Sequence, residues 1–338
     1  MNCYITYDYE LCLGKKTGTP EGCLFLPMDA LCEMFDRYGV KVNVFVDAAY
    51  VLRLRELKDT NDKLLYEFES VVNHINSLSN RGHSIQLHFH PQWVKANYIN
   101  DTWCLDNDHY KLSDFPLSIQ KEKLSQAIEL LQSISNNRIV AMRAGGFSIE
   151  NFEDLAPFLL NQGIFIDTSV LRGGVVKTKY QTYDYSNIPL YTSYPFKDNN
   201  KKIDDCGGFM EYPISVMEIN SISYTILKNI KRKKLEKEYV NYTSQRWNDG
   251  VGIGANVDMQ ARIKNLFERL FKKSPLYASA DGSLVYFLQD VLNYCKKSYK
   301  GSDFVIIGHP KIASPRTVAA LETFIKNNQE IISFYTFS

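Results

Sequence analysis

The chain has 338 residues, 45% hydrophobic and 23% charged, so it carries enough apolar surface to bury a large core and is not expected to be disordered. Its 39 Lys and Arg residues nearly balance 38 Asp and Glu residues, and this net charge of +1 argues against nucleic acid as a main partner. No apolar run reaches the length of a transmembrane helix, and the N-terminal residues lack the apolar core of a signal peptide. The cysteines are scattered without a CxxC pair, which favours free thiols and, with the missing signal, predicts a cytoplasmic protein.

Short apolar runs alternate with segments of helical periodicity along most of the chain. The runs predict strands at 2–7, 41–47, 84–89, 139–144, 164–170, 209–215 and 304–307, with a last apolar run at 331–337. Helices are expected after the first strand, where Leu31, Met34 and Phe35 recur, and at 61–80, 118–135 and 149–161. A final helix should begin at Ser314 as N-cap, with Pro315 at its first position. This alternation predicts parallel strands joined by right-handed crossovers, in an open sheet or a barrel.

Three segments do not fit the repeated unit. Residues 91–117 and 171–208 are too long for ordinary connections and are predicted to be functional loops. The tyrosines of the second loop could offer flat faces to sugar rings, or could simply pack the loop against the core. Residues 217–300 are expected to form a mostly helical insertion, as a lid or a dimer surface, within a single domain of residues 1–338.

Polar residues end the predicted strands, where parallel α/β proteins gather their chemistry. Asp8 and Glu10 are two apart, so their carboxylates leave the first strand on one side and imply a metal site or an acid–base pair, unless they lie in a solvated turn. His88 and His90 end the third strand with the same spacing. Two histidines and a carboxylate are typical of a catalytic divalent metal site, although an isolated pair is often structural.

Three later strand ends complete the set of candidates. Arg143 precedes Gly145 and Gly146, and an arginine there can hold a carboxylate or a substrate. Asp167 ends the fifth strand and is expected to have a partner, for which Arg143 is one choice. His309 ends a late strand and is placed to donate a proton.

The order D-x-E, H-x-H, R-A-G-G, D-T and G-H-P resembles the motifs of the polysaccharide deacetylase (NodB-homology, carbohydrate esterase) family over 1–215 and 303–337. The resemblance implies a distorted (β/α) barrel of about seven parallel strands. It also implies one divalent ion, with zinc the leading candidate and cobalt, manganese and nickel as alternatives. Its residue roles carry over to Asp8 as catalytic base, Glu10 and His88 as metal ligands, Arg143 as orienting residue, Asp167 as support for the acid and His309 as general acid.

Two departures from the family pattern concern the metal ligands. The family has adjacent aspartates where this chain has Asp8, Tyr9 and Glu10, so the ligand role moves to a longer side chain. The family also spaces its histidines four apart, which would select Gln92 here, and strand periodicity therefore assigns the second histidine role to His90.

The resemblance predicts a hydrolase that removes an N- or O-linked acetyl group from a sugar or glycan precursor, in surface polysaccharide biosynthesis. Two alternatives remain: a sugar-binding pseudoenzyme, and an amide hydrolase acting on a small non-sugar substrate. The sequence does not set the oligomeric state.

Overall fold

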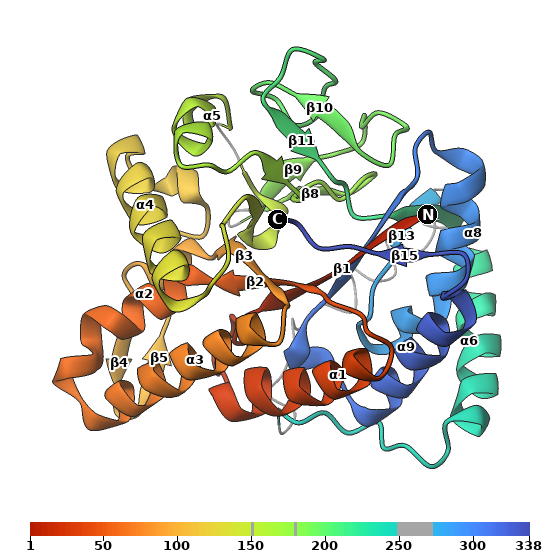
Figure 1. Cartoon of the computed structure of the whole chain (residues 1–338), viewed down its shortest axis with the longest axis horizontal. Helices are drawn as coiled ribbons and strands as arrows, with labels where there is room; N and C mark the ends of the chain where they lie inside the picture. Colours follow the sequence, from red (N-terminus) through yellow and green to blue (C-terminus); the bar gives the residue numbers. More distant parts are fainter. Residues whose placement is uncertain (150–151, 179–180, 249–272) are drawn as a thin grey trace.

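The computed structural model describes residues 1–149, 152–178, 181–248 and 273–338. Within these ranges one curled sheet of nine strands forms the core, in the order β10-β11-β7-β6-β3-β2-β1-β14, with β15 beside β1 (Figure 1). Its strands are β1 (Asn2–Tyr9), β2 (Asn43–Asp47), β3 (Ser84–Phe89), β6 (Ala141–Ala144), β7 (Ile166–Asp167), β10 (Tyr194–Phe196), β11 (Phe209–Glu211), β14 (Asp303–Gly308) and β15 (Ser333–Phe334). The neighbours are parallel except that β10 runs antiparallel to β11. The predicted distorted (β/α) barrel is confirmed.

Helices connect the strands and cover the outside of the sheet (Figure 1). They are α1 (Leu26–Arg37), α2 (Ala48–Leu57), α3 (Asp62–Asn80), α4 (Leu117–Ile134), α5 (Phe152–Asn161), α6 (Ser221–Glu238), α8 (Leu288–Ser298) and α9 (Pro315–Asn328). The predicted start of α9 is confirmed, because the Ser314 hydroxyl accepts a hydrogen bond from the Thr317 amide. None of the helices within the described ranges is long and apolar enough to cross a membrane.

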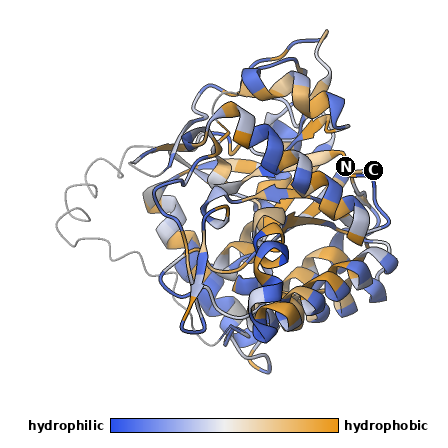
Figure 2. Cartoon of the chain, turned by 90° about the vertical axis from the view of Figure 1, so that its left-hand side faces the viewer, coloured by the Kyte–Doolittle hydropathy of each residue, from blue (hydrophilic) through white to orange (hydrophobic). Residues whose placement is uncertain are grey.

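The core strands are buried on both faces, as parallel sheets in α/β proteins are. Every residue of β2, β3, β6 and β14 is buried. Figure 2 shows the contrast in hydropathy, with largely hydrophobic strands and helices that carry both kinds of residue. Burial on both faces produces the continuous apolar runs from which these strands were predicted.

The two long loops each contain a small hairpin. Residues 91–117 form β4 (Asn97–Ile99) and β5 (Thr102–Cys104), and residues 171–208 form β8 (Val175–Lys177) and β9 (Thr182–Asp184) besides β10. The predicted strand at 164–170 is shorter than expected, because only Ile166–Asp167 keeps strand pairing before the chain leaves the sheet.

The predicted insertion is partly built into the barrel wall. Its β12 (Val216–Asn220) and β13 (Lys273–Tyr277) form an antiparallel ribbon. Beyond β13 the chain runs beside β14, where the Ala280 amide donates to the Ile307 carbonyl and the Ile307 amide donates to the Ala278 carbonyl. Residues 278–280 therefore close the wall next to β14, while 249–272 lie outside the described residues.

Candidate active site

The register of the sheet brings the polar strand ends to one edge of the barrel. His88 in β3 is the register partner of Asp47 in β2 on one side and of Arg143 in β6 on the other. Asp8 lies near the end of β1, which pairs with β2 and β14. Side chains that are distant in sequence are thus held on a rigid frame, as an active site requires.

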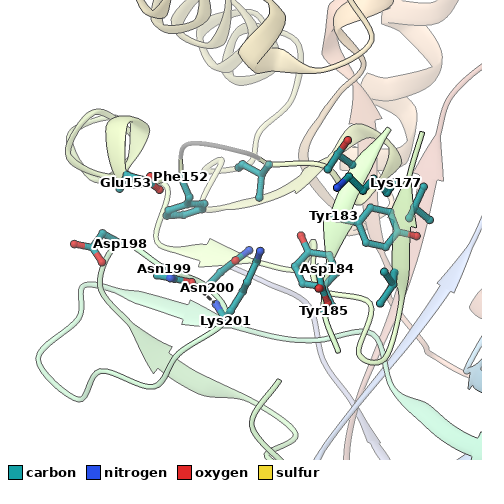
Figure 3. Close-up of a pocket in the computed structure, with 14 residues that line it drawn as sticks. Phe152, Glu153, Lys177, Tyr183, Asp184, Tyr185, Asp198, Asn199, Asn200 and Lys201 are labelled. Carbon is teal, nitrogen blue, oxygen red and sulfur yellow. Dashed lines mark hydrogen bonds between the residues drawn. The ribbon is translucent and has the colours of Figure 1, made fainter. Parts of the chain in front are cut away.

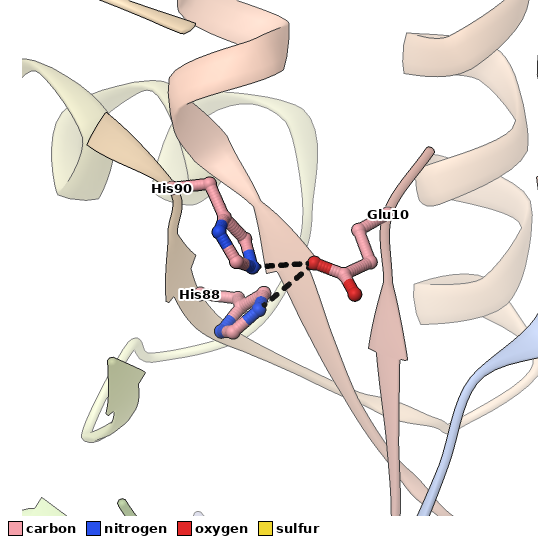
Figure 4. Close-up of side chains that lie close together, drawn as sticks. All are labelled: Glu10, His88 and His90. Atoms are coloured by element: carbon pink, nitrogen blue, oxygen red, sulfur yellow. Dashed lines mark hydrogen bonds and ion pairs between the residues drawn. The ribbon is translucent and has the colours of Figure 1, made fainter. Parts of the chain in front are cut away.

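Glu10, His88 and His90 form a buried group whose ligand atoms all lie within 4.8 Å of one another. The Nε2 atoms of His88 and His90 lie 3.2 and 2.6 Å from the same Glu10 oxygen, Oε2 (Figure 4). His90 follows β3, and its backbone amide donates to Asp47 at 3.1 Å. The structure thus brings His90 to Glu10, as strand periodicity predicts.

The orientation of the His88 ring suits a metal ligand. Nδ1 of His88 donates to the Arg143 carbonyl at 2.8 Å, which orients the ring and turns Nε2 toward Glu10. Burial disfavours the charged imidazole of His88, but Asp8 and Glu10 outweigh that effect and raise the pKa of His88 to about 9. Because two imidazoles and one carboxylate converge through single atoms, a divalent cation could replace the protons on the two Nε2 atoms.

Asp8 lies beside this group and is held by Arg143. The guanidinium donates to Asp8 Oδ1 at 2.5 Å and to Thr6 Oγ1 at 2.9 Å, and it is fully buried. Burial raises the pKa of Asp8, but the charges of Arg143, His88 and His309 together outweigh burial and bring the pKa below its ordinary value. Asp8 is therefore ionised at neutral pH. Its free Oδ2 lies 3.9 Å from His88 Nε2.

His309 lies beside Asp8, directly after β14, and has a carboxylate partner of its own, Asp281. Its Nε2 atom is 3.6 Å from Asp8 Oδ2 and 3.6 Å from Glu10 Oε1. Its Nδ1 atom lies 2.7 Å from Asp281 Oδ2, and its amide donates to Asp281 Oδ1 at 2.8 Å. Burial lowers the pKa of His309, but Asp281 more than offsets this and the pKa is raised. The protonated imidazole needed by a proton donor is thus favoured.

The two partners predicted for Asp167 are wrong. Arg143 pairs with Asp8, and the residue that supports His309 is Asp281. Asp167 ends β7 on the far side of β6 and accepts hydrogen bonds from Ser169 Oγ at 2.5 Å and Asn200 Nδ2 at 2.7 Å. Asp281 was missed because it lies in the predicted insertion, and it reaches His309 because residues 278–280 pair with β14.

Lys311 is a second residue that the sequence did not reveal, and it directly contacts Glu10 of the candidate metal site. It lies in the turn Pro310–Ile312 after β14, and its Nζ donates to Glu10 Oε1 at 2.8 Å. Burial raises the pKa of Glu10, but Lys311 and His90 outweigh it, so that the pKa falls well below its ordinary value. The sequence signal was a lysine two residues after His309, which is too common a pattern to single out.

Gly145 makes room for His90. A Cβ atom at this position would lie 2.6 Å from the Phe89 carbonyl oxygen and 2.7 Å from His90 Nδ1, too close for any side chain. The groups that approach Gly145 most closely are thus the Phe89 carbonyl and the His90 ring. Gly146 follows with φ of 60°, a left-handed conformation that glycine adopts at little cost.

The aromatic side chains of the loop 171–208 pack the loop against the core and also line a cavity. Tyr185, Tyr194 and Phe196 are buried and hold the loop down. Tyr183 stacks on Tyr185 with ring centroids 5.2 Å apart, and both line a cavity of about 560 Å³ with Lys177 and residues 198–201 (Figure 3). This cavity is separate from the candidate metal site, because it is not lined by Glu10, His88 or His90.

No protein-family model and no curated protein sequence matches the chain. Solved structures do match. A Mycobacterium smegmatis protein described as a polysaccharide deacetylase aligns with a TM-score of 0.52 at 15% identity, over 99% of this chain and 85% of that one. The Puue allantoinase aligns with a TM-score of 0.45 at 13% identity, over 99% and 86%. The family 4 carbohydrate esterase from Streptomyces lividans, in complex with acetate, gives 0.41 at 8% identity, over 100% and 93%.

At such low identity the likeness establishes architecture, and chemistry has to be argued from the site. The match to the Mycobacterium smegmatis protein extends over nearly the whole chain. The chain therefore has the fold of the polysaccharide deacetylases.

Proposed function

We propose that this protein is a metal-dependent hydrolase that removes an N- or O-linked acetyl group from a sugar unit of a glycan or glycan precursor. The observation that carries the proposal is the convergence of two imidazole Nε2 atoms on Glu10 Oε2, between an ionised Asp8 and a His309 that favours its protonated form. Such an arrangement would supply a ligand set, a base and an acid within one buried site, as acyl hydrolysis requires.

Glu10, His88 and His90 would hold the cation, for which zinc is the leading candidate because imidazole and carboxylate are common zinc ligands. When bound, the cation would supply Lewis acidity toward the acyl oxygen and lower the pKa of water. Asp8 would accept the proton of the attacking water through Oδ2, while Arg143 holds Oδ1 and keeps the carboxylate oriented.

His309 would act on the opposite side of the acyl group. Its Nε2 atom faces Asp8 and Glu10, and Asp281 fixes the ring through Nδ1. An imidazolium held in this way can protonate the departing nitrogen or oxygen as the tetrahedral intermediate collapses. The acid and the base would therefore come from the ends of two neighbouring strands, since His309 follows β14 and Asp8 lies in β1.

The choice of a carbohydrate rests on the fold, which this chain shares with a Mycobacterium smegmatis protein described as a polysaccharide deacetylase. A glycan precursor inside the cell, before export to the cell surface, would fit the cytoplasmic location expected from the sequence. The biosynthetic role remains part of the proposal.

The proposal is tested with protein stripped by a chelator and reloaded with zinc, cobalt, manganese or nickel. Acetate release is measured on N-acetylated and O-acetylated oligosaccharides and on a small non-sugar amide, with metal content determined on the same samples. We expect one metal ion per chain and acetate release from a sugar substrate, with both lost in His90→Ala. Binding of oligosaccharide without metal or turnover would identify a sugar-binding pseudoenzyme. Cleavage of the non-sugar amide alone would identify an amide hydrolase that acts on a small non-sugar substrate.

A further inference from the structure

The two oxygens of the Glu10 carboxylate have separate partners. Oε2 faces both histidines, at 3.2 Å from His88 Nε2 and 2.6 Å from His90 Nε2. Oε1 accepts a hydrogen bond from Lys311 Nζ at 2.8 Å. The carboxylate is thus divided between a lysine on one side and the imidazole pair on the other.

Lys311 is itself held firmly. Its Nζ also donates to the Leu11 carbonyl at 2.8 Å, and its own carbonyl accepts from Asn248 Nδ2 at 2.7 Å. The residue is 8% exposed. Hydrogen bonds hold both the ammonium group and the backbone of this lysine. The ammonium group therefore fixes the position of the carboxylate oxygen that it contacts.

The second cation of the site does not share this task. Arg143 donates to Asp8 Oδ1 and to Thr6. Asp8 and Glu10 therefore each have their own buried cationic side chain, which donates to one oxygen of the carboxylate. The other oxygens, Asp8 Oδ2 and Glu10 Oε2, face His88.

We propose that Lys311 is a positioning residue that restricts Glu10 to a single oxygen, Oε2, for binding a divalent cation. Carboxylates bind cations through one oxygen or through both, and a second oxygen would fill a position that a hydrolase needs for water or substrate. By holding Oε1, Lys311 keeps that position open. The inference rests on the proposed metal site, and it adds a residue that determines how this site coordinates.

The inference predicts opposite changes in affinity and turnover. In Lys311→Met, Glu10 loses the cation that competes for its charge and gains a free oxygen, so we expect metal affinity to rise several-fold. Turnover on the best acetylated substrate should fall at least tenfold, because the added ligand oxygen closes the open position. General damage to the fold would instead lower both quantities.

The test measures the dissociation constant of zinc by competition with a chelator, and the visible absorption spectrum of the cobalt(II) protein. The spectrum reports the coordination number without any substrate, and we expect weaker bands in Lys311→Met as this number increases. Lys311→Gln retains an N–H donor and should lie closer to the wild type, and it carries the test if the Met variant does not fold. Lys123→Met is a matched control, since Lys123 also donates to a glutamate, Glu56, at 2.8 Å but lies on α4.

The outcomes separate the inference from the proposed function. A wild-type protein that binds no metal overturns both. Metal binding with the same affinity and cobalt spectrum in the wild type and Lys311→Met overturns the inference alone, as does a joint loss of affinity and melting temperature. A changed cobalt spectrum with higher affinity supports the role of Lys311 even if no acetylated sugar is cleaved.

Discussion

At the scale of single residues, the sequence predicted which polar side chains come together better than it predicted their hydrogen-bond partners. Asp8, Glu10, His88, His90 and His309 all lie together, because each ends a strand at the same edge of the sheet. Strand periodicity is a local property, so it is readable from sequence. The partners Asp281 and Lys311 depend on which distant segment passes beside His309 and Glu10, and no local pattern carries that information.

Asp281→Asn should shift the pH profile of the reaction. Asp281 raises the pKa of His309, and a neutral amide cannot do so, hence the pKa of His309 should fall in this variant. Because a general acid works in its protonated form, the alkaline limb of the profile should move to lower pH. The measurement is the turnover number from pH 5 to 10, with the exposed Asp59→Asn as control. An unshifted alkaline limb would remove His309 or Asp281 from the assigned pair.

Gly145→Ala should damage the metal site more than the fold. The added Cβ would meet His90 Nδ1 and the Phe89 carbonyl, and displacing a ligand ring typically costs about 10–100-fold in metal affinity. Zinc competition titration provides the measurement. Gly39→Ala is the control, since its φ of 64° strains an alanine while no atom lies within 4 Å of the new Cβ. Equal zinc affinity in the two variants would contradict the role of Gly145.

At the scale of elements, the paired strands β7 and β11 bring two buried carboxyl groups side by side. Asp167 and Glu211 are register partners in these parallel strands. Asp167 accepts from Ser169 and Asn200, whereas Glu211 Oε2 has no donor among the described residues. Burial, and next the charge of Asp167, raise the pKa of Glu211 well above its ordinary value. Glu211 is therefore the member that keeps its proton and shares it with Asp167.

This pair predicts a stability that falls as pH rises. The unfolded chain releases the Glu211 proton near pH 4.5, while the folded protein retains it to a much higher pH. In that window the folded state binds more protons, so the free energy of unfolding drops by up to about 1.4 kcal/mol per pH unit. Glu211→Gln should flatten this decline. Melting temperatures from pH 5 to 9 test it, with the exposed Glu69→Gln as control, and parallel curves for the wild type and Glu211→Gln would refute it.

The barrel wall shows where element prediction from sequence stops. The strands β1, β2, β3 and β14 are short segments rich in apolar and β-branched residues, and all were predicted. Residues 278–280 are strand-like because of their pairing with β14, not because of a distinctive sequence of their own. No local pattern reveals a long-range pairing of this kind, so residues 217–300 were predicted to be an insertion although residues 278–280 pair with β14.

At the scale of the whole molecule, a bound cation would tie β1 to β3 and should stabilise the folded chain. Ligand binding to the native state alone adds about 2.7 kcal/mol at a hundredfold excess over the dissociation constant. We therefore expect zinc to raise the melting temperature and a chelator to lower it. The check is calorimetry with and without zinc. His90→Ala should show no zinc-dependent shift, and a shift that persisted there would place the stabilising ion elsewhere.

The place of β1 in the sheet has a consequence for how the protein is made. Asn2–Tyr9 pairs on one side with β2, which follows closely, and on the other with Asp303–Gly308, at the opposite end of the chain. At about 5–20 residues per second, the ribosome needs on the order of 15–60 seconds to supply that second neighbour. During this interval β1 has an open edge, and the carboxylate of Glu10 awaits the ammonium of Lys311. Folding should thus be slow and sensitive to chaperones, with the reactive centre among the last parts to assemble.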